Sequence, residues 1–308
     1  MSEKSTDWIA GIEKVWPMAL SFDAADDQLY HYTSLDSFIA IYDSDKLYGT
    51  HYLDLNDDAE FKIGFDYACR YLKRRFEHEH NWNDVEILLK KANAMMRKLG
   101  VLNCSCPWIT SFTSTCNSMP HWIAYTDRHA GGLAAGLSLT GLKDKVDEFN
   151  RRHFENVGLF TGVAAFLLPC FYCEKPEKPD AQLDRLLDIL FSDEMSVSAG
   201  NDCALQIYWG LMLFASFAKH RSFEWEKEWR LATFNFGGDW APGVIKRIGG
   251  KMRVPFGVDK PIGIRELIKA VMVSPHNSKQ NHRHLVSLKA GGNIQCEITR
   301  SGLPYNGR

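Results

Sequence analysis

The spacing of apolar side chains divides the chain into short extended runs and longer helical segments. Runs rich in β-branched and aromatic residues predict strands. These are residues 29–33, 46–50, 108–113, 133–137, 268–273 and 294–299. Apolar positions three and four residues apart predict helices. They are residues 7–17, 35–42, 58–76, 84–99, 141–156, 181–191, 204–219 and 279–289, with a short helix that begins at Pro120.

Two longer apolar runs, residues 159–170 and 205–217, are shorter than the roughly 18 residues that a bilayer span needs. We therefore expect both to be buried core and expect no membrane association. No internal repeat or low-complexity segment interrupts the pattern. It predicts an α+β fold with helical insertions, in which residues 1–28 form a helical appendage and residues 29–308 form a single domain.

The segment 223–230 alternates three glutamates with aromatic and basic residues, directly before an apolar run at 231–234. On an extended backbone Glu224, Glu226 and Glu228 project to the same side. A row of like charges is explained either by a solvated edge strand or by a site that uses the negative charge. We favour a site because aromatic residues and an arginine accompany the glutamates, and because a second polar cluster lies far upstream.

Composition limits the classes of partner. The chain has 308 residues, 45% of them hydrophobic, which suffices for an ordinary globular core. Its 36 basic and 38 acidic residues leave a net charge of −2, so no overall field attracts nucleic acid or an anionic membrane. The first seven residues are polar and lack the apolar core of a signal peptide, which predicts a cytoplasmic protein.

Eight cysteines are spread along the chain, and without a secretory signal we expect reduced thiols. A zinc ion could join two pairs, Cys104 with Cys106 and Cys170 with Cys173. However, the first pair is spaced more tightly than a usual zinc knuckle, and the second lies in apolar sequence. We therefore expect no metal.

The upstream polar cluster surrounds His31, which is flanked by two tyrosines and followed by two hydroxyl side chains. Such a group can bind a polar ligand, although a lone histidine in a strand is more often structural. Ser111 opens a run of alternating hydroxyls with the same two interpretations. Trp122 and Tyr125 lie three residues apart on a predicted helix, so their rings share a face. They fit core packing or stacking on a planar heterocycle.

The order of these motifs along the chain is informative. The motifs are residues 29–34, 55–57 with 60–61, 111–113 with 122–125 and 131–132, 219–220 with 223 and 226–230, and 298–305. In this order they resemble a bacterial domain-of-unknown-function family, number twenty-nine seventy-one, over nearly the whole chain. The tryptophan-x-x-tyrosine element at 122–125 and the glutamate-x-glutamate-tryptophan-arginine element at 226–230 are the most specific parts of the resemblance.

The resemblance implies a remote branch of the ADP-ribosyltransferase fold, in which two small antiparallel sheets form a cleft for NAD. Members of that fold use a histidine or arginine on the first strand, a hydroxyl or aromatic group in the middle, and a late glutamate. The matching positions are His31, then Ser111 or Tyr125, then Glu226 or Glu228. Arginine-modifying members have an arginine where this chain has His31, so the resemblance does not imply an arginine acceptor.

The same resemblance implies roles for these residues in cleaving NAD. Glu228 would face the ribose 2′-hydroxyl and stabilise the positive charge that builds on the sugar. Glu226 would orient or deprotonate the incoming nucleophile. Arg230 would pair with a carboxylate or with the pyrophosphate, and a structural ion pair is the alternative. The expected NAD contacts are His31, Tyr32, Thr33, Ser111, Trp122, Tyr125 and Arg230.

These expectations define one leading function and two alternatives. The first is an NAD-consuming enzyme that transfers ADP-ribose to a protein or nucleic acid, or hydrolyses NAD, with a toxin or phage-defence role implied by the resemblance alone. The second is a nucleotide-sensing module of the same fold without turnover. The third is an RNA-processing enzyme such as a 2′-phosphotransferase, which the near-zero net charge disfavours. The sequence leaves the acceptor and the oligomeric state open.

Overall fold

The computed structural model describes most of the chain from residue 27 to residue 304. The described residues are 27–55, 58–77, 86–87, 89–90, 94, 107–127, 129–154, 163–191, 201–235, 244–257 and 262–304, without side chains at 58–60, 153–154 and 201–206. Several expectations lie outside them: the helix at 7–17, most of the helix at 84–99, Cys104 and Cys106. The expected boundary at residue 28 falls inside the first strand, which begins at Gln28.

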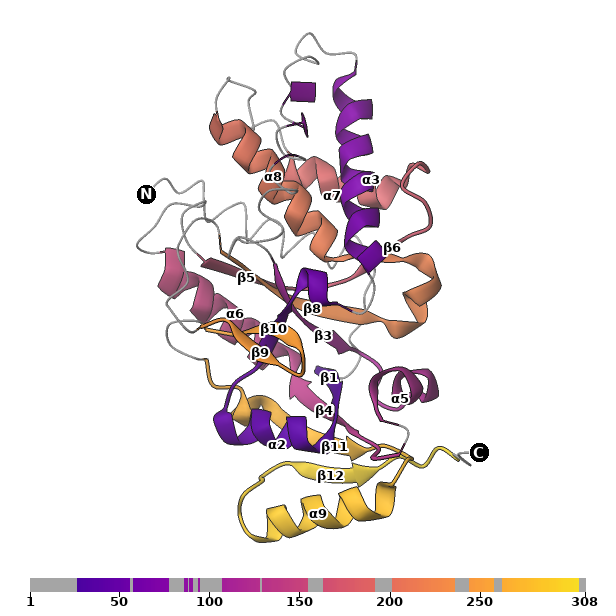
Figure 1. Ribbon diagram of the computed structural model, residues 1–308, viewed down its shortest axis with the longest axis vertical. Helices are drawn as coiled ribbons and strands as arrows, with labels where there is room; N and C mark the ends of the chain where they lie inside the picture. The colour runs from indigo at the N-terminus through magenta and orange to yellow at the C-terminus, as the bar shows by residue number, and fades with distance from the viewer. Residues whose placement is uncertain are drawn as a thin grey trace.

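Ten strands form one mixed sheet that runs through the middle of the molecule (Figure 1). They are β1 (Gln28–Thr33), β2 (Tyr48–His51), β3 (Trp108–Thr113), β4 (Leu133–Ser138), β5 (Val163–Pro169), β8 (Glu228–Asn235), β9 (Lys246–Ile248), β10 (Lys251–Pro255), β11 (Ile268–Val273) and β12 (Glu297–Arg300). Their order is β12-β11-β4-β1-β3-β2-β10-β9, while β8 pairs with both β3 and β5. A separate parallel pair joins β6 (Phe171–Cys173) to β7 (Ala218–His220).

Strand β3 is the branch point of the large sheet. It pairs with β8 along its whole length, from Trp108 to Thr113. Its other edge is shared between two strands: β2 pairs at Trp108 and Ile109, whereas β1 pairs only at Thr113. Residues 110–112 lie between these two attachments, so β1 and β2 diverge there and the sheet forms a fork. The expected pair of small antiparallel sheets is not confirmed.

Helices cover the sheet at both ends of the molecule (Figure 1). They are α2 (Leu35–Ser44), α3 (Asp58–Phe76), α5 (Met119–Tyr125), α6 (Leu139–Phe154), α7 (Ala181–Leu190), α8 (Asn201–Ser216) and α9 (Ser278–Ala290). Helix α2 begins as the sequence predicts, because the Ser34 hydroxyl accepts a hydrogen bond from the Ser37 amide at 3.1 Å. Helix α3 matches the predicted residues 58–76.

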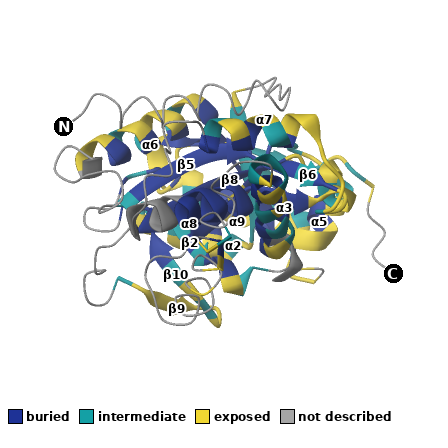
Figure 2. Ribbon diagram, turned by 90° about the horizontal axis from the view of Figure 1, so that it is seen from above, coloured by how far each residue is buried: buried dark blue, intermediate teal, exposed yellow. Residues whose placement is uncertain are grey.

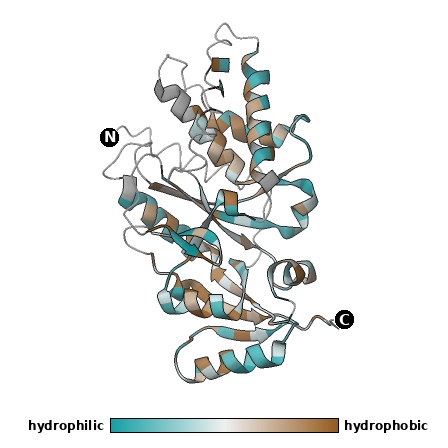
Figure 3. Ribbon diagram, viewed as in Figure 1, coloured by the Kyte–Doolittle hydropathy of each residue, from teal (hydrophilic) through white to brown (hydrophobic). Residues whose placement is uncertain are grey.

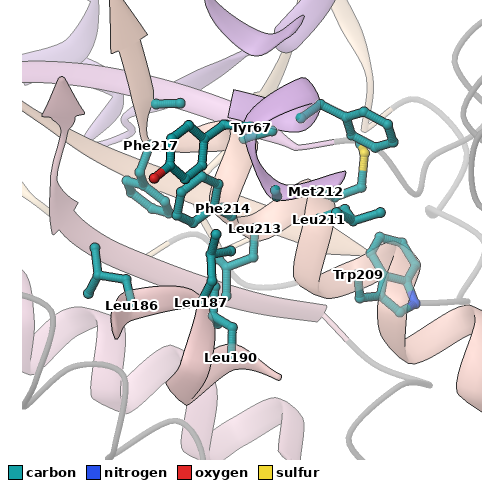
Figure 4. Packing of buried hydrophobic residues seen from close by; sticks show 14 of the residues in the cluster. Tyr67, Leu186, Leu187, Leu190, Trp209, Leu211, Met212, Leu213, Phe214 and Phe217 are labelled. Atoms are coloured by element: carbon teal, nitrogen blue, oxygen red, sulfur yellow. The ribbon is translucent and has the colours of Figure 1, made fainter. Parts of the chain in front are cut away.

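The larger apolar core lies where α3, α7 and α8 meet β5 and β8. Tyr67, Phe214 and Phe217 are fully buried there, beside leucines of α7 (Figure 4). Helix α8 is buried and apolar around much of its circumference (Figures 2 and 3). It approaches α3 closely, since a Cβ on Gly64 would lie 2.9 Å from the Ala215 Cα. Among the residues described, no helix combines the length and apolar character that crossing a membrane requires.

A second core lies around the β1 arm of the fork, where α2, α6 and α9 pack against β1, β4 and β11. It includes Phe38 of α2, Phe149 of α6 and Leu285 of α9, all at most 1% exposed. Strand β4 begins after Gly131, whose φ of +72° lets the chain turn sharply out of the loop that follows α5. This core holds the β1 arm in place, while β2 is fixed by its pairing with β3 and β10, so the fork is a fixed part of the fold.

One element prediction was wrong near the end of α8, and one hairpin was missed. The predicted helix 204–219 stops at Ser216, and residues 218–220 form β7, so Lys219 lies on a strand. The hairpin of β9 and β10 was not predicted, because both strands are short, β9 is exposed, and neither has an apolar stripe.

The prediction of one extended acidic strand over 223–230 was also wrong. Residues Arg221–Glu226 form a 3₁₀ helix, Lys227 has a left-handed φ of 44°, and β8 begins only at Glu228. The turn is held by tertiary contacts, since the Thr113 hydroxyl donates to the Glu226 carbonyl at 2.6 Å. Glu224 is consequently exposed, whereas Glu226 and Glu228 are buried.

Candidate functional site

A cavity of about 490 Å³ lies in the fork between β1, β2 and β3, a size typical of small-molecule sites. It brings together residues that are about 195 positions apart in the sequence. The predicted site residues that line it are His31, Tyr32, Thr33, Ser111, Tyr125, Glu226, Glu228 and Arg230. The first strand and the late glutamates therefore meet in one cavity, as the sequence predicts.

Two buried carboxylates and two buried cations form the floor of this cavity. The Lys219 ammonium contacts Glu226 and lies 2.6 Å from Glu228 Oε2. The guanidinium of Arg230 donates from Nε to Glu228 Oε1 at 2.9 Å and from Nη1 to the Ser216 carbonyl at 2.8 Å. Lys219, Glu226, Glu228 and Arg230 are each at most 4% exposed. Buried charges persist only when they are paired in this way.

The environment separates the pKa values of the two glutamates. Burial raises the pKa of Glu226, and the nearby Glu228 charge adds to this effect, although Lys219 opposes it. Burial alone would also raise the pKa of Glu228, but the charges and hydrogen bonds of Arg230 and Lys219 outweigh it and lower the pKa to about 2. The lowered pKa keeps Glu228 ionised, whereas Glu226 takes up a proton at higher pH than an ordinary glutamate, and such a separation of two carboxylates is typical of acid–base pairs.

Several side chains fix the position of Glu226. The Tyr125 hydroxyl donates to Glu226 Oε1 at 2.8 Å. Thr113 and His121 both hydrogen-bond the Glu226 carbonyl, at 2.6 Å and 3.2 Å respectively. A carbonyl only accepts, so His121 carries its proton on Nε2. Glu228, at the start of β8, is also held in place, because its amide donates to the hydroxyl of Tyr172 on β6 at 2.9 Å.

His31 bridges the open part of the fork. Its Nδ1 lies 2.9 Å from the Ser111 carbonyl oxygen, and because a carbonyl only accepts, Nδ1 must donate. Burial lowers the pKa of His31, and the positive charge of Arg253 acts in the same direction. The ring is therefore neutral at pH 7, which leaves Nε2 with a lone pair that can accept a hydrogen bond from a ligand hydroxyl.

The structure separates the two rings of the tryptophan-x-x-tyrosine element. Tyr125 is 36% exposed and lines the cavity. Trp122 is fully buried, outside the cavity lining, where its ring meets Tyr32 edge-on at 4.6 Å and its Nε1 donates to Asn117 at 3.0 Å. The expected contact between Trp122 and a ligand was wrong, because the inward face of α5 is packed against the sheet.

Sequence reasoning gave no role to three cations that line the cavity: Lys219, Lys251 and Arg253. Lys219 carried a signal, because it is a charged residue directly after the apolar stretch that forms α8. Lys251 and Arg253 follow the Gly249-Gly250 turn at spacing two, which places both on one face of β10. That spacing could have indicated a basic strand if the hairpin had been recognised.

No group of three or more histidine, cysteine or acidic side chains suited to a metal ion occurs among the described residues. The zinc hypothesis involves Cys104 and Cys106, which are not among them, and the buried Cys170 and Cys173. Searches against protein-family models, curated proteins and solved structures find no match to this chain. Any assignment of function therefore depends on the geometry of the cavity and on the motif resemblance.

Proposed function

We propose that this protein is an NAD-consuming enzyme of the ADP-ribosyltransferase type, which transfers ADP-ribose to a macromolecule or to water. The observation that carries the proposal is the convergence of His31, Tyr125, Glu226 and Glu228 in one cavity at the fork of the sheet. A first-strand histidine and a late glutamate that share one cleft are the arrangement that the motif resemblance implies. The separated pKa directions of the two glutamates add support from the residues themselves.

In the proposed reaction the bond between nicotinamide and ribose C1′ breaks, and its electron pair leaves with nicotinamide. Positive charge then builds on the sugar ring. Glu228, ionised and held by Lys219 and Arg230, faces the ribose 2′-hydroxyl and stabilises that charge. Because Glu228 is already oriented by two cations, it does not reorganise as the bond breaks.

The nucleophile, water or an acceptor group, attacks C1′ and loses a proton to Glu226. The products are nicotinamide and ADP-ribose, free or attached to the acceptor. The raised pKa of Glu226 makes it a stronger base than an ordinary glutamate, which suits it to this step. The Tyr125 hydroxyl, 2.8 Å from Glu226 Oε1, keeps the carboxylate aimed into the cavity.

The remaining cavity residues orient the substrate. His31 Nε2 accepts a hydrogen bond from a ribose hydroxyl, while Thr33 and Ser111 offer hydroxyls to the sugar or the amide. The exposed ring of Tyr125 supplies an apolar surface for the nicotinamide. Arg230 contacts Glu228 and the Ser216 carbonyl, so its role is to position Glu228.

One observation favours a second candidate, a sensor that binds a nucleotide without turnover. The two carboxylates are matched by two cations, so the floor of the cavity carries little net negative charge. Less negative charge means less stabilisation of a cationic sugar. Both candidates therefore bind the nucleotide, but only the enzyme cleaves it.

Incubation with NAD and measurement of free nicotinamide by chromatography distinguishes them. We expect the wild type to release nicotinamide and Glu228→Gln to release it at least about 100-fold more slowly, the usual cost of losing a preorganised electrostatic group. Glu224→Gln is the matched control, because Glu224 is exposed on the preceding turn and should leave the rate unchanged.

Glu226→Gln provides a second variant in case Glu228→Gln disturbs folding, which circular dichroism would detect. If the wild type releases no nicotinamide, alone or with protein and RNA acceptors, yet binds ADP-ribose, the sensor replaces the enzyme. Nicotinamide release that is equal in the wild type and in both folded variants would overturn the assigned roles.

A further inference from the structure

The hairpin of β9 and β10 forms one wall of the cavity. Ile248, Lys251 and Arg253 all line it, while the turn between the strands uses Gly249 and Gly250 at positive φ. The hairpin is anchored at both ends of β10. The Met252 amide donates to Asp54 at 2.7 Å, and the Phe256 amide donates to the Leu47 carbonyl at 2.7 Å. This wall therefore has a defined position relative to the fork.

Arg253 differs from the two cations on the cavity floor. Lys219 and Arg230 are each held by buried carboxylates. Arg253 is half-buried and makes no ion pair with any residue in the described part of the chain, and its Nε is buried without a hydrogen-bond partner there. A buried N–H in this state is costly unless a ligand or a water molecule accepts its hydrogen bond, and a ligand that enters the cavity can do so.

Residues that pair with one another across neighbouring strands form a row of the sheet, and Arg253 and Glu228 lie in different rows. Arg253 pairs with Thr50, which in turn pairs with Ile109 of β3. Glu228 pairs with Thr113, four residues further along β3. Four residues of strand correspond to about 13 Å, so the cavity has a carboxylate row and a cationic row that are well separated.

We propose that Arg253 binds the phosphates of the ligand, so that a phosphorylated nucleotide lies with its phosphates against β10 and its sugar toward the glutamates. This inference rests on the proposed function for the identity of the nucleotide and adds how the nucleotide is recognised and oriented. A diphosphate offers several acceptor oxygens to the planar guanidinium, which can bind two of them at once. Lys251, on the same face of β10, adds a second positive charge.

The position of His31 is consistent with this orientation. Its pKa is lowered mainly by burial and also by the charge of Arg253, so the two groups lie close enough to interact. A neutral His31 between the two rows would contact the ribose that links the phosphates to the reacting bond. Each charged or polar part of a dinucleotide then meets a group of suitable chemistry.

The test is calorimetric titration of the full chain with ADP-ribose, ADP and adenosine. We expect Arg253→Gln to weaken ADP-ribose and ADP binding by about 10- to 100-fold, the range for a charge-assisted contact. Adenosine binding should not change. Arg253→Lys keeps the positive charge but lacks the planar guanidinium that can bind two oxygens at once. Its affinity for ADP-ribose should therefore fall between those of the wild type and Arg253→Gln.

Arg247→Gln is the matched control, because Arg247 is an exposed residue of the same hairpin that pairs with Met252 and lies outside the cavity lining. It should bind ADP-ribose as the wild type does. The proposal is overturned if folded Arg253→Gln retains wild-type affinity, or if the wild type binds adenosine as tightly as ADP. Arg253-dependent ADP-ribose binding without nicotinamide release would refute only the enzymatic function, whereas release that is indifferent to Arg253 would refute only this inference.

Discussion

Lys219 links the two glutamates of the cavity floor. Its ammonium contacts both carboxylates and is 3% exposed, so solvent cannot replace it. The side chain comes from β7, whereas Glu226 and Glu228 lie on either side of the left-handed Lys227. The same ammonium that stabilises Glu228 as an anion therefore also limits how far the pKa of Glu226 can rise.

We expect Lys219→Met to lower the free energy of unfolding by about 3–5 kcal/mol at pH 8, because it leaves two buried carboxylates with one cation. The loss should be smaller at pH 5 than at pH 8, because the raised pKa of Glu226 lets it take up a proton at higher pH than an ordinary glutamate does. Urea denaturation followed by fluorescence measures both values. Lys178→Met removes an exposed lysine whose partner is Glu174, and should cost less than about 1 kcal/mol. A similar small loss for Lys219→Met would contradict the buried network.

At the scale of elements, the sheet depends on how its strand β5 is held on the side that no strand pairs with in the described part of the chain. Strand β5 pairs with β8 alone among the described strands. Asn150 of α6 covers the other side of β5, since its side chain accepts from the Ala165 amide at 2.9 Å and donates to the Ala165 carbonyl at 2.8 Å. One buried side chain thus satisfies both backbone groups of a strand residue.

We expect Asn150→Leu to destabilise the protein by about 2–4 kcal/mol, because it leaves a buried N–H and a buried C=O unsatisfied. Leucine is similar in size, so a cavity is not the cause. Thermal unfolding by circular dichroism measures the effect, with the exposed Asn293→Leu as the control. Equal melting temperatures for the two variants would show that α6 does not hold β5 through this contact.

At the scale of the whole molecule, Glu228 makes the stability of the fold depend on pH. Its folded pKa of about 2 is below the ordinary value of 4.5. Its contribution is therefore fully present above about pH 4.5 and is lost as the pH falls through 2. Glu226 has the opposite sign, because its raised pKa makes the folded state hold a proton to higher pH than the unfolded chain does.

We expect the stability difference between the wild type and Glu228→Gln to be largest above about pH 5 and to shrink steadily toward about pH 2.5. Urea denaturation at a series of pH values gives this difference directly. Glu224→Gln should show no such trend, because Glu224 is exposed and its partner is the exposed Arg221. A difference that stays constant with pH would mean that Glu228 is not held as an anion by Lys219 and Arg230.

Local signals in the sequence predicted most of the elements. Residues 58–76, 108–113 and 268–273 have the predicted type and bounds. The helical periodicity of residues 58–76 extends over many residues, and the two strands are rich in β-branched and aromatic residues. Each signal therefore favours the observed type of element over the other type. The acidic segment failed because alternation at 223–230 satisfies a strand pattern while tertiary hydrogen bonds to the Glu226 carbonyl hold a turn there.

The candidate site was predicted only in part, because local sequence signals identify some of its residues and tertiary packing decides the others. His31, Ser111 and the glutamates were found as polar residues in strand-like surroundings, which is a local property of the sequence. Trp122 was wrongly placed in the site, because the sequence of a short helix does not show which of its faces packs against the core. Arg253 was missed because its strand is short and has no apolar alternation, and because only the pairing of β10 with β2 brings it to the cavity.

The sequence by itself determined most of the helical and extended segments and which side chains can carry charge or donate hydrogen bonds, because these depend on near neighbours in the chain. The tertiary structure decided which of those side chains meet. The fork at β3, the pairing of Lys219 with two glutamates, and the approach of β10 to β1 all join residues distant in sequence. Burial there sets the pKa of each group, and burial is a property of the packed molecule.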